Sequence, residues 1–179
     1  MVDPRTAARL SYRALYLLLA LADLFQRLIP LSALPRGWPA PNILLCLTVL
    51  WVQRRPDYLP SFMVAAVFFL DDLMTMRPPG LWALIVLVGT EILRTREAGM
   101  RDLPFWGEWL AASLVMTAMT LTYQVVLTVF MVPGVSLGPV MLGLLATIAL
   151  YPVLAFGLQW LAGLRRTATG EVDALGQRL

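Results

Sequence analysis

Apolar residues form six segments along the chain, and short polar or proline- and glycine-containing stretches separate them. The segments cover residues 12–31, 41–53, 58–75, 80–93, 108–132 and 137–164. The last two are the clearest, because no charged residue lies between Glu108 and Arg165. A run of that length suffices for two membrane-crossing helices of about 20 residues each. Proline and glycine at 133–134 and again at 138–139 predict a turn between them.

The pattern as a whole predicts an all-α fold, a polytopic membrane protein with about six transmembrane helices in one bundle. Some of the first four segments are less regular. Segment 12–31 contains Asp23 and Arg27, while segments 41–53 and 80–93 are shorter than the roughly 17 residues that an unaided crossing needs. Short segments of this kind can thin the bilayer or lie within the bundle, and both interpretations stay open.

Composition and charge support this prediction. The chain is 59% hydrophobic and 14% charged, with a mean hydropathy of +0.74, whereas an ordinary soluble domain carries about 25% charged residues. All 14 basic residues are arginines. With six crossings, most of them fall on the side that holds both termini: Arg5, Arg9, Arg13, Arg54, Arg55, Arg94, Arg96, Arg101, Arg165, Arg166 and Arg178. Because arginine-rich loops stay in the cytoplasm, both termini are predicted to be cytoplasmic.

Residues 1–166 are predicted to form a single transmembrane domain, and residues 167–179 a short, disordered cytoplasmic tail. The start of the chain has a second interpretation. Its arginines, the following apolar run and the small residues at 20–22 are also typical of a cleaved signal peptide. The apolar character continues to Leu31, which favours a first transmembrane helix instead.

The scarce side-chain chemistry excludes several classes of site. The sequence has no histidine, so Ser-His-Asp and Cys-His catalysis and imidazole-bound metals are excluded. Its one cysteine, Cys46, cannot form an internal disulfide. No cofactor or metal ion is expected, and a net charge of +3 is modest for a nucleic-acid-binding protein. A scaffold, a transporter or an enzyme built on carboxylates, serine, threonine or tyrosine remains possible.

Carboxylates inside apolar segments are costly and therefore candidates for function. Asp71 and Asp72 point about 100° apart on a helix, so one can face the bundle and the other lipid or water. An intramembrane aspartyl protease would need an acid on another helix, and Asp23 is the one available. Capping of the following turn by Asp72, or pairing with an arginine, explains these residues better.

Two further acids stand beside arginines on the same helical face. Asp23 and Arg27 are four residues apart, and Glu91 and Arg94 are three apart. Such spacings favour ion pairs within one helix. Pairing is therefore preferred to a role in transport.

A polar stripe follows one face of segment 108–132. It consists of Ser113, Thr117, Thr120 and Gln124. Small hydroxyl residues let helices approach and hydrogen-bond, so the stripe predicts a helix–helix seam or a docking face for a partner. A substrate path would need polar groups opposite it. In the last segment, Pro152 predicts a kink.

Two patches show more pattern than loops require. The first is Pro41, Asn42, an apolar stretch, Trp51, Arg54, Arg55 and Pro56. Its tryptophan is expected at the lipid interface and its arginines at the anionic leaflet surface, facing cytoplasmic partners. The second is Asp72, Leu73, Thr75, Pro78, Gly80 and Leu81, followed by an alanine-leucine pair. It predicts a helix end, a tight turn on the periplasmic face and a new helix near Gly80.

In these two patches the sequence resembles the bacterial rod shape-determining protein MreD family, whose members are small polytopic proteins of about this size. The similarity covers roughly residues 10–96. Family members commonly have aspartate where Asn42 stands, so no negative charge is carried over there, although asparagine can still cap a helix start.

The resemblance implies a non-enzymatic membrane component of the cell-elongation (rod) machinery in the bacterial inner membrane. Members of the family act with MreC, the MreB filament, and a RodA-type glycosyltransferase and its transpeptidase partner to guide lateral peptidoglycan synthesis and cell shape. The family fold is thought to be similar to the substrate-binding subunits of ECF vitamin transporters. A small-solute-binding subunit of that kind is therefore the alternative function.

Overall fold

All secondary structure is helical in the part of the chain that the computed structural model describes, residues 4–28, 40–96, 99, 104–132 and 136–162. The helices are α1 (Pro4–Leu28), α2 (Ile43–Arg54), the short 3-10 helix η1 (Pro56–Tyr58), α3 (Ser61–Met74), α4 (Leu81–Thr95), α6 (Phe105–Val129) and α7 (Leu137–Ala162). The expected all-α class is confirmed for these residues. The predicted tail, 167–179, lies outside them.

Residues of restricted or permissive backbone set the helix starts. Asn42 caps α2, because its side-chain oxygen accepts a hydrogen bond from the Leu45 amide. Pro60 and Pro104 precede α3 and α6 with φ near −65°, a value compatible with entry into a helix. Gly80 precedes α4 with a φ of 85°, in the left-handed region that glycine adopts without steric cost.

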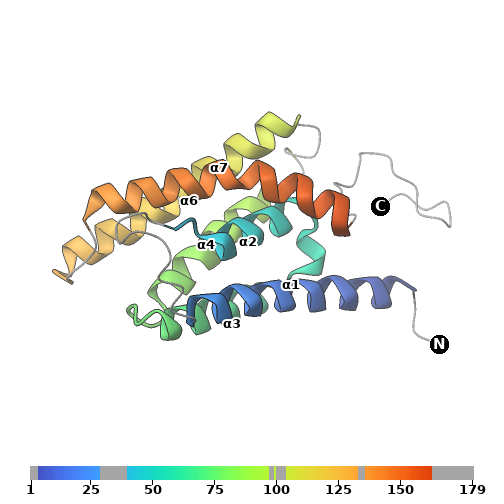
Figure 1. Ribbon diagram of the computed structural model, residues 1–179, viewed down its shortest axis with the longest axis horizontal. Helices are drawn as coiled ribbons and strands as arrows, with labels where there is room; N and C mark the ends of the chain where they lie inside the picture. Colours follow the sequence, from blue (N-terminus) through green and yellow to red (C-terminus); the bar gives the residue numbers. More distant parts are fainter. Residues whose placement is uncertain (1–3, 29–39, 97–98, 100–103, 133–135, 163–179) are drawn as a thin grey trace.

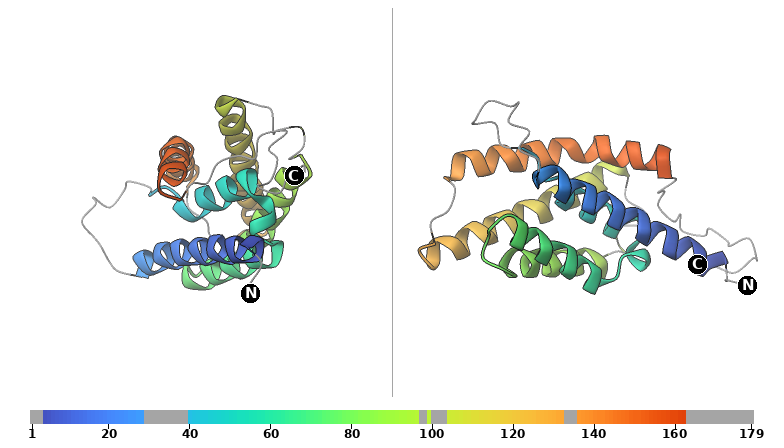
Figure 2. Two further views of the ribbon diagram at one scale, coloured as in Figure 1. Left: turned by 90° about the vertical axis from the view of Figure 1, so that its right-hand side faces the viewer. Right: turned by 60° about the horizontal axis from the view of Figure 1, so that its bottom comes forward.

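Consecutive long helices run in opposite directions, so that α1 begins and α7 ends at the same end of the molecule (Figure 1). Helices α1 and α3 lie on one side, α6 and α7 on the other, and α2 and α4 between them (Figures 1 and 2). α2 packs against α7, α4, α6 and α1, and α3 packs mainly against α4.

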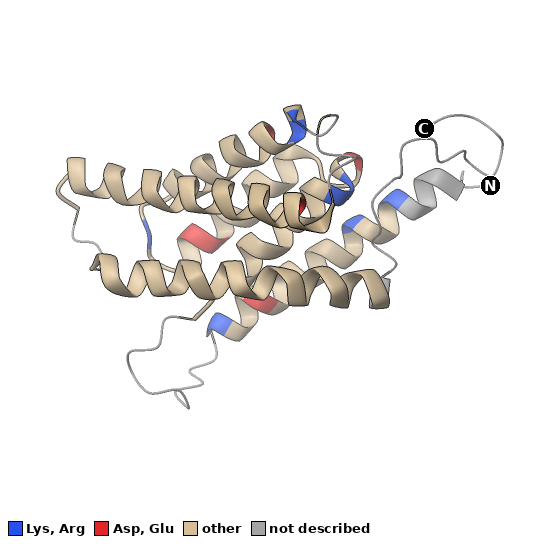
Figure 3. Ribbon diagram, turned by 90° about the horizontal axis from the view of Figure 1, so that it is seen from above, with Lys and Arg blue, Asp and Glu red and all other residues tan. Residues whose placement is uncertain are grey.

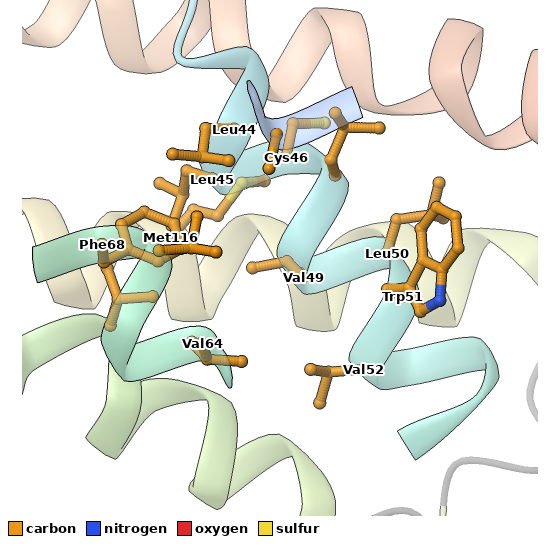
Figure 4. Packing of buried hydrophobic residues seen from close by; sticks show 14 of the residues in the cluster. Leu44, Leu45, Cys46, Val49, Leu50, Trp51, Val52, Val64, Phe68 and Met116 are labelled. Carbon is orange, nitrogen blue, oxygen red and sulfur yellow. The ribbon is translucent and has the colours of Figure 1, made fainter. Parts of the chain in front are cut away.

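The core is built around α2. Its residues from Leu44 to Val52 and its last residue, Arg54, are buried. Their neighbours include Val64 and Phe68 of α3 and Met116 of α6 (Figure 4). Segment 41–53 therefore lies within the described bundle, one of the two interpretations left open for its short length.

The outer helices α6 and α7 have the opposite character. With 25 and 26 residues they are about 38 Å long. Residues Phe105–Val129 and Leu137–Trp160 are each long and apolar enough to cross a membrane, and only 22% of either apolar window is buried. Their exposed side chains include Trp106, Leu114, Val153 and Phe156. These two helices thus present large apolar surfaces that the rest of the described chain does not cover.

Candidate functional site

A polar cluster joins the end of α1 to the start of α2 and the end of α3. Arg27 is at its centre: its Nη2 lies 2.8 Å from Asp23 Oδ2, and its Nη1 lies 3.1 Å from Asp71 Oδ1. The same guanidinium donates to Asn42 Oδ1 over 3.2 Å. Arg77 reaches the second oxygen of Asp71 at 3.4 Å. The predicted Asp23–Arg27 pair is confirmed, and Asp71 is held by two arginines.

Asp72 closes the turn between α3 and α4. Its Oδ2 accepts hydrogen bonds from the Gly80 amide at 3.0 Å and from the Ala83 amide at 3.2 Å. Both aspartates are completely buried, so the expectation that one of them faces lipid or water is wrong. The reason is local, because the first-turn amides of α4 lack helical partners and a carboxylate satisfies two of them. The predicted capping role of Asp72 is confirmed.

The other residues of the second patch shape the same turn. The Thr75 hydroxyl donates to the Asp71 carbonyl at 2.6 Å, and the Leu81 amide donates to the Pro78 carbonyl at 3.3 Å. Leu73 is 46% exposed on the outer surface of α3. The patch is therefore mainly a structural unit that places α4 against α3.

The start of the first patch also lies at a joint between helices. Besides capping α2 and accepting from Arg27, Asn42 donates its backbone amide to Thr147 Oγ1 of α7 at 2.9 Å. Pro41, just before it, is half-buried. An uncharged amide oxygen suffices for both acceptor roles of Asn42, which explains why asparagine can stand at this position.

The end of the first patch differs from expectation. Trp51 is completely buried and contacts the edge of the Tyr16 ring, with 5.6 Å between centroids. Arg54 is only 5% exposed. The expected positions of these two residues at the lipid interface and leaflet surface are wrong, because α2 is enclosed by other helices. Arg55 is half-buried, with its guanidinium carbon 5.6 Å from the centre of the Tyr58 ring, and Pro56 is buried.

Arg54 belongs to a buried network that sequence reasoning did not find. Its Nε lies 3.0 Å from Glu108 Oε1 of α6, and its Nη1 donates to the Ala155 carbonyl of α7 at 3.1 Å. The Tyr151 hydroxyl lies 2.8 Å from Glu108 Oε1 and 2.6 Å from Gln53 Oε1. Glu108 is 2% exposed. The sequence did contain a signal for this network, because Glu108 is the acid at the start of a long uncharged segment.

Arginines also organise the turn between α2 and α3. Arg94 of α4 donates to the Pro56 carbonyl at 3.0 Å and to the Leu59 carbonyl, and it pairs with Glu91 at 3.2 Å. Arg13 of α1 donates its Nε to the Tyr58 carbonyl at 3.1 Å. The predicted Glu91–Arg94 pair is confirmed.

The polar stripe of α6 lies beside its packing seam. The hydroxyls of Ser113, Thr117 and Thr120 donate to carbonyls four residues earlier in the same helix, at 2.7–2.8 Å. These residues and Gln124 are half-buried. The fully buried face of α6 consists instead of Glu108, Ala112, Met116, Met119 and Leu127. A docking role for the stripe stays a prediction.

Pro152 creates a specific contact between α6 and α7. It lies inside α7 and has no amide hydrogen for the Ile148 carbonyl four residues earlier. The indole nitrogen of Trp109 donates to that carbonyl at 3.0 Å. A side chain of α6 thus satisfies the group that the proline leaves open.

An apolar groove of about 390 Å³ runs between α3 and α4 on the outside of the bundle. Three alanines and one glycine are among its lining residues. It is lined by Ala65, Ala66, Phe69, Gly80, Ala83, Leu84 and Leu87. We call this surface the α3–α4 groove.

No protein-family model, curated protein or solved structure matches this chain. In the part of the chain that the structure describes, no group of three or more histidine, cysteine, aspartate or glutamate residues is placed to hold a metal ion.

Proposed function

We propose that this chain is a non-enzymatic, multi-pass component of the bacterial inner membrane that acts as a scaffold in the cell-elongation machinery. Its partners would be an MreC-like membrane protein, the MreB filament, and a RodA-type glycosyltransferase with its transpeptidase. The main support comes from Asp72 and Gly80, which belong to the second patch, the more specific part of the MreD-like pattern. They form one hydrogen-bonded turn, in which a carboxylate holds the start of α4 next to a left-handed glycine.

The distribution of charge supports an orientation with both termini in the cytoplasm. Among the described residues, arginines lie in the first half of α1, after its grey start, and at the ends of α2 and α4 (Figure 3). At the opposite end of the described bundle, Arg27 and Arg77 are paired with aspartates. The long apolar helices α6 and α7 supply two crossings, and α1, α3 and α4 complete the bundle around α2.

The packing favours a scaffold over the two alternatives. A solute-binding subunit needs a polar cavity within the bundle, whereas the centre of this one is filled by apolar side chains around Leu45, Val49 and Phe68 (Figure 4). An intramembrane protease needs two acids that share a water molecule. Here Asp71 is held by arginines and Asp72 by backbone amides.

The α3–α4 groove suits a transmembrane helix of the MreC-like partner. Without a hydrophobic driving force between helices in lipid, association depends on close packing, and small residues allow backbones to approach. Ala66 is exposed at the groove and Ala83 lies at its floor. Leu84, 58% exposed, forms a wall against which a partner side chain can pack.

The test is recovery of the MreC-like partner from detergent-solubilised membranes with purified, tagged chain. Ala66→Trp fills the groove from an exposed position and is expected to reduce recovery at least tenfold. Ala118→Trp makes the same change at an exposed position on α6 and serves as the control. If both variants recover the partner equally, the α3–α4 groove is not its docking site. Failure of the wild-type chain to recover the partner, together with a copurifying small molecule found by mass spectrometry, supports the solute-binding alternative.

A further inference from the structure

The turn between α2 and α3 brings together two residues of α1, one residue of η1 and Arg55, which lies between α2 and η1. Tyr12 of α1 stacks on Tyr58 of η1, with 5.2 Å between ring centroids and 23° between planes. The guanidinium of Arg55 lies 5.6 Å from the centre of the Tyr58 ring. Arg13, one residue after Tyr12, donates to the Tyr58 carbonyl. We call Tyr12, Arg13, Arg55 and Tyr58 the arginine–tyrosine turn.

The hydrogen bonds of this turn hold Arg13 in place but do not use all of its donors. Arg94 is committed to two carbonyls and to Glu91, so it holds the turn in place. Arg13 uses its Nε for the Tyr58 carbonyl, and its terminal nitrogens make no hydrogen bond within the described ranges of the chain. A guanidinium anchored by Nε presents its two terminal groups in a fixed fork, which suits a phosphate or carboxylate.

The charge around the turn is positive. Exposed Arg9 lies one helical turn before Arg13, and exposed Arg96 lies just after Arg94. Among the described residues, the acids near the turn are Asp57, which is exposed, and Glu91, which is paired with Arg94. Five arginines therefore stand against two acids in this part of the described surface: Arg9, Arg13, Arg55, Arg94 and Arg96.

Apolar surface beside the turn indicates a lipid rather than a soluble anion. Phe62, four residues after Tyr58, is 72% exposed on α3, and Leu10 on α1 is 55% exposed. Stacked tyrosines are typical of the headgroup level of a bilayer, because each ring has an apolar body and a polar tip. An acyl chain can lie beside Phe62 while its headgroup reaches the arginines.

We infer that the arginine–tyrosine turn binds the phosphate of an anionic phospholipid in the cytoplasmic leaflet. Arg13 and Arg55 contact the phosphate oxygens, Tyr12 and Tyr58 form the interfacial platform, and the lipid's acyl chains lie beside Phe62. The inference rests on the membrane placement in the proposed function, but not on any of its protein partners.

The experiment is native mass spectrometry of the full chain in detergent with equimolar phosphatidylglycerol and phosphatidylcholine of identical acyl chains. The wild-type chain is expected to retain phosphatidylglycerol in roughly tenfold preference. The variant Arg13→Gln/Arg55→Gln is expected to lose that preference. Arg9→Gln/Arg96→Gln removes two charges from the same end outside the turn and is expected to keep at least half of it.

Several results would overturn the inference. If both double variants lose the phosphatidylglycerol preference equally, the lipid is attracted by the overall positive charge and not by this turn. If Arg13→Gln/Arg55→Gln keeps the preference, the lipid binds elsewhere. If inorganic phosphate at about 10 mM displaces the lipid, the turn prefers a free anion to a phospholipid. Continued protection of buried Cys46 from a maleimide verifies that each variant is folded. The lipid experiment contains no partner protein, so a negative result is distinct from a failure to recover the MreC-like partner. Membrane insertion is tested separately: the chain is expected to sediment with membranes after carbonate washing.

Discussion

The buried pair between Arg54 and Glu108 gives the most demanding test of the described packing. The two side chains are 5% and 2% exposed, and their charged atoms are 3.0 Å apart. Replacing Arg54 by methionine keeps a long unbranched side chain but removes the guanidinium that pairs with Glu108. Replacing Glu108 by leucine removes the carboxylate from the same pair. Each single variant therefore takes an ion-pair partner away from a buried charge.

The expected magnitude follows from the cost of such a charge. Removing one partner of a buried ion pair destabilises a protein by about 3–5 kcal/mol, whereas replacing both partners by apolar residues is often neutral. Arg54→Met and Glu108→Leu are each expected to lower the free energy of unfolding by roughly that amount. The double variant should cost less than either single variant. Tyr151 keeps Gln53 as a hydrogen-bond partner in it.

The chain provides its own probe for the measurement. Cys46 is its one cysteine and is completely buried on α2, so a maleimide labels it only when the bundle opens. Unfolding by sodium dodecyl sulfate in mixed micelles, followed by Cys46 labelling, yields the free-energy differences. Arg96→Met is the control: it makes the same substitution at an exposed residue just after α4 and should cost no more than about 1 kcal/mol.

Two results would refute the reasoning. If Arg54→Met costs no more than Arg96→Met, the Arg54 guanidinium is not in the buried position described. If the cost of the double variant equals the sum of the single costs, Arg54 and Glu108 do not interact.

Three further substitutions test other joints of the bundle. Gly80→Ala forces a side chain onto a residue with a φ of 85° and should lower the free energy of unfolding by roughly 1 kcal/mol, measured by the same Cys46 labelling. Gly89→Ala places a Cβ 2.9 Å from Met119 Cγ and should cost about 1–3 kcal/mol; a cost unchanged in a Met119→Ala background would show that the two helices do not touch there. Trp109→Phe removes the donor to the Ile148 carbonyl and should lower the free energy of unfolding by about 1–3 kcal/mol, seen as a lower melting temperature in detergent. An unchanged melting temperature would show that water replaces the indole as donor.

Interactions within one helix were predictable from the sequence. The pairs Asp23–Arg27 and Glu91–Arg94 follow from spacings of four and three residues, which fix side-chain proximity once a helix forms. The Asp72 turn was predictable for a similar reason, since its partners are eight and eleven residues away across one tight connection.

Interactions between helices were not predictable in this way. Arg54 meets Glu108 from a position 54 residues earlier, and Asn42 meets Thr147 across 105 residues. Nothing local specifies these encounters, which depend on how the helices pack. Trp51 shows the same limit, because a tryptophan three residues before an arginine pair is typical of a membrane interface. The placement of α2 inside the bundle overrides that preference.

The position of α2 explains why polar groups stand at both of its ends. Apolar packing is non-directional, so a short helix surrounded by leucine and valine side chains has little to resist sliding along its axis. Asn42 bonds α1 and α7 at one end of α2, and Arg54 bonds α6 and α7 at the other. These hydrogen bonds have defined lengths and directions. They therefore fix the axial position of α2 relative to α7, and the two ends of that attachment are the two ends of the first sequence patch, Asn42 and Arg54.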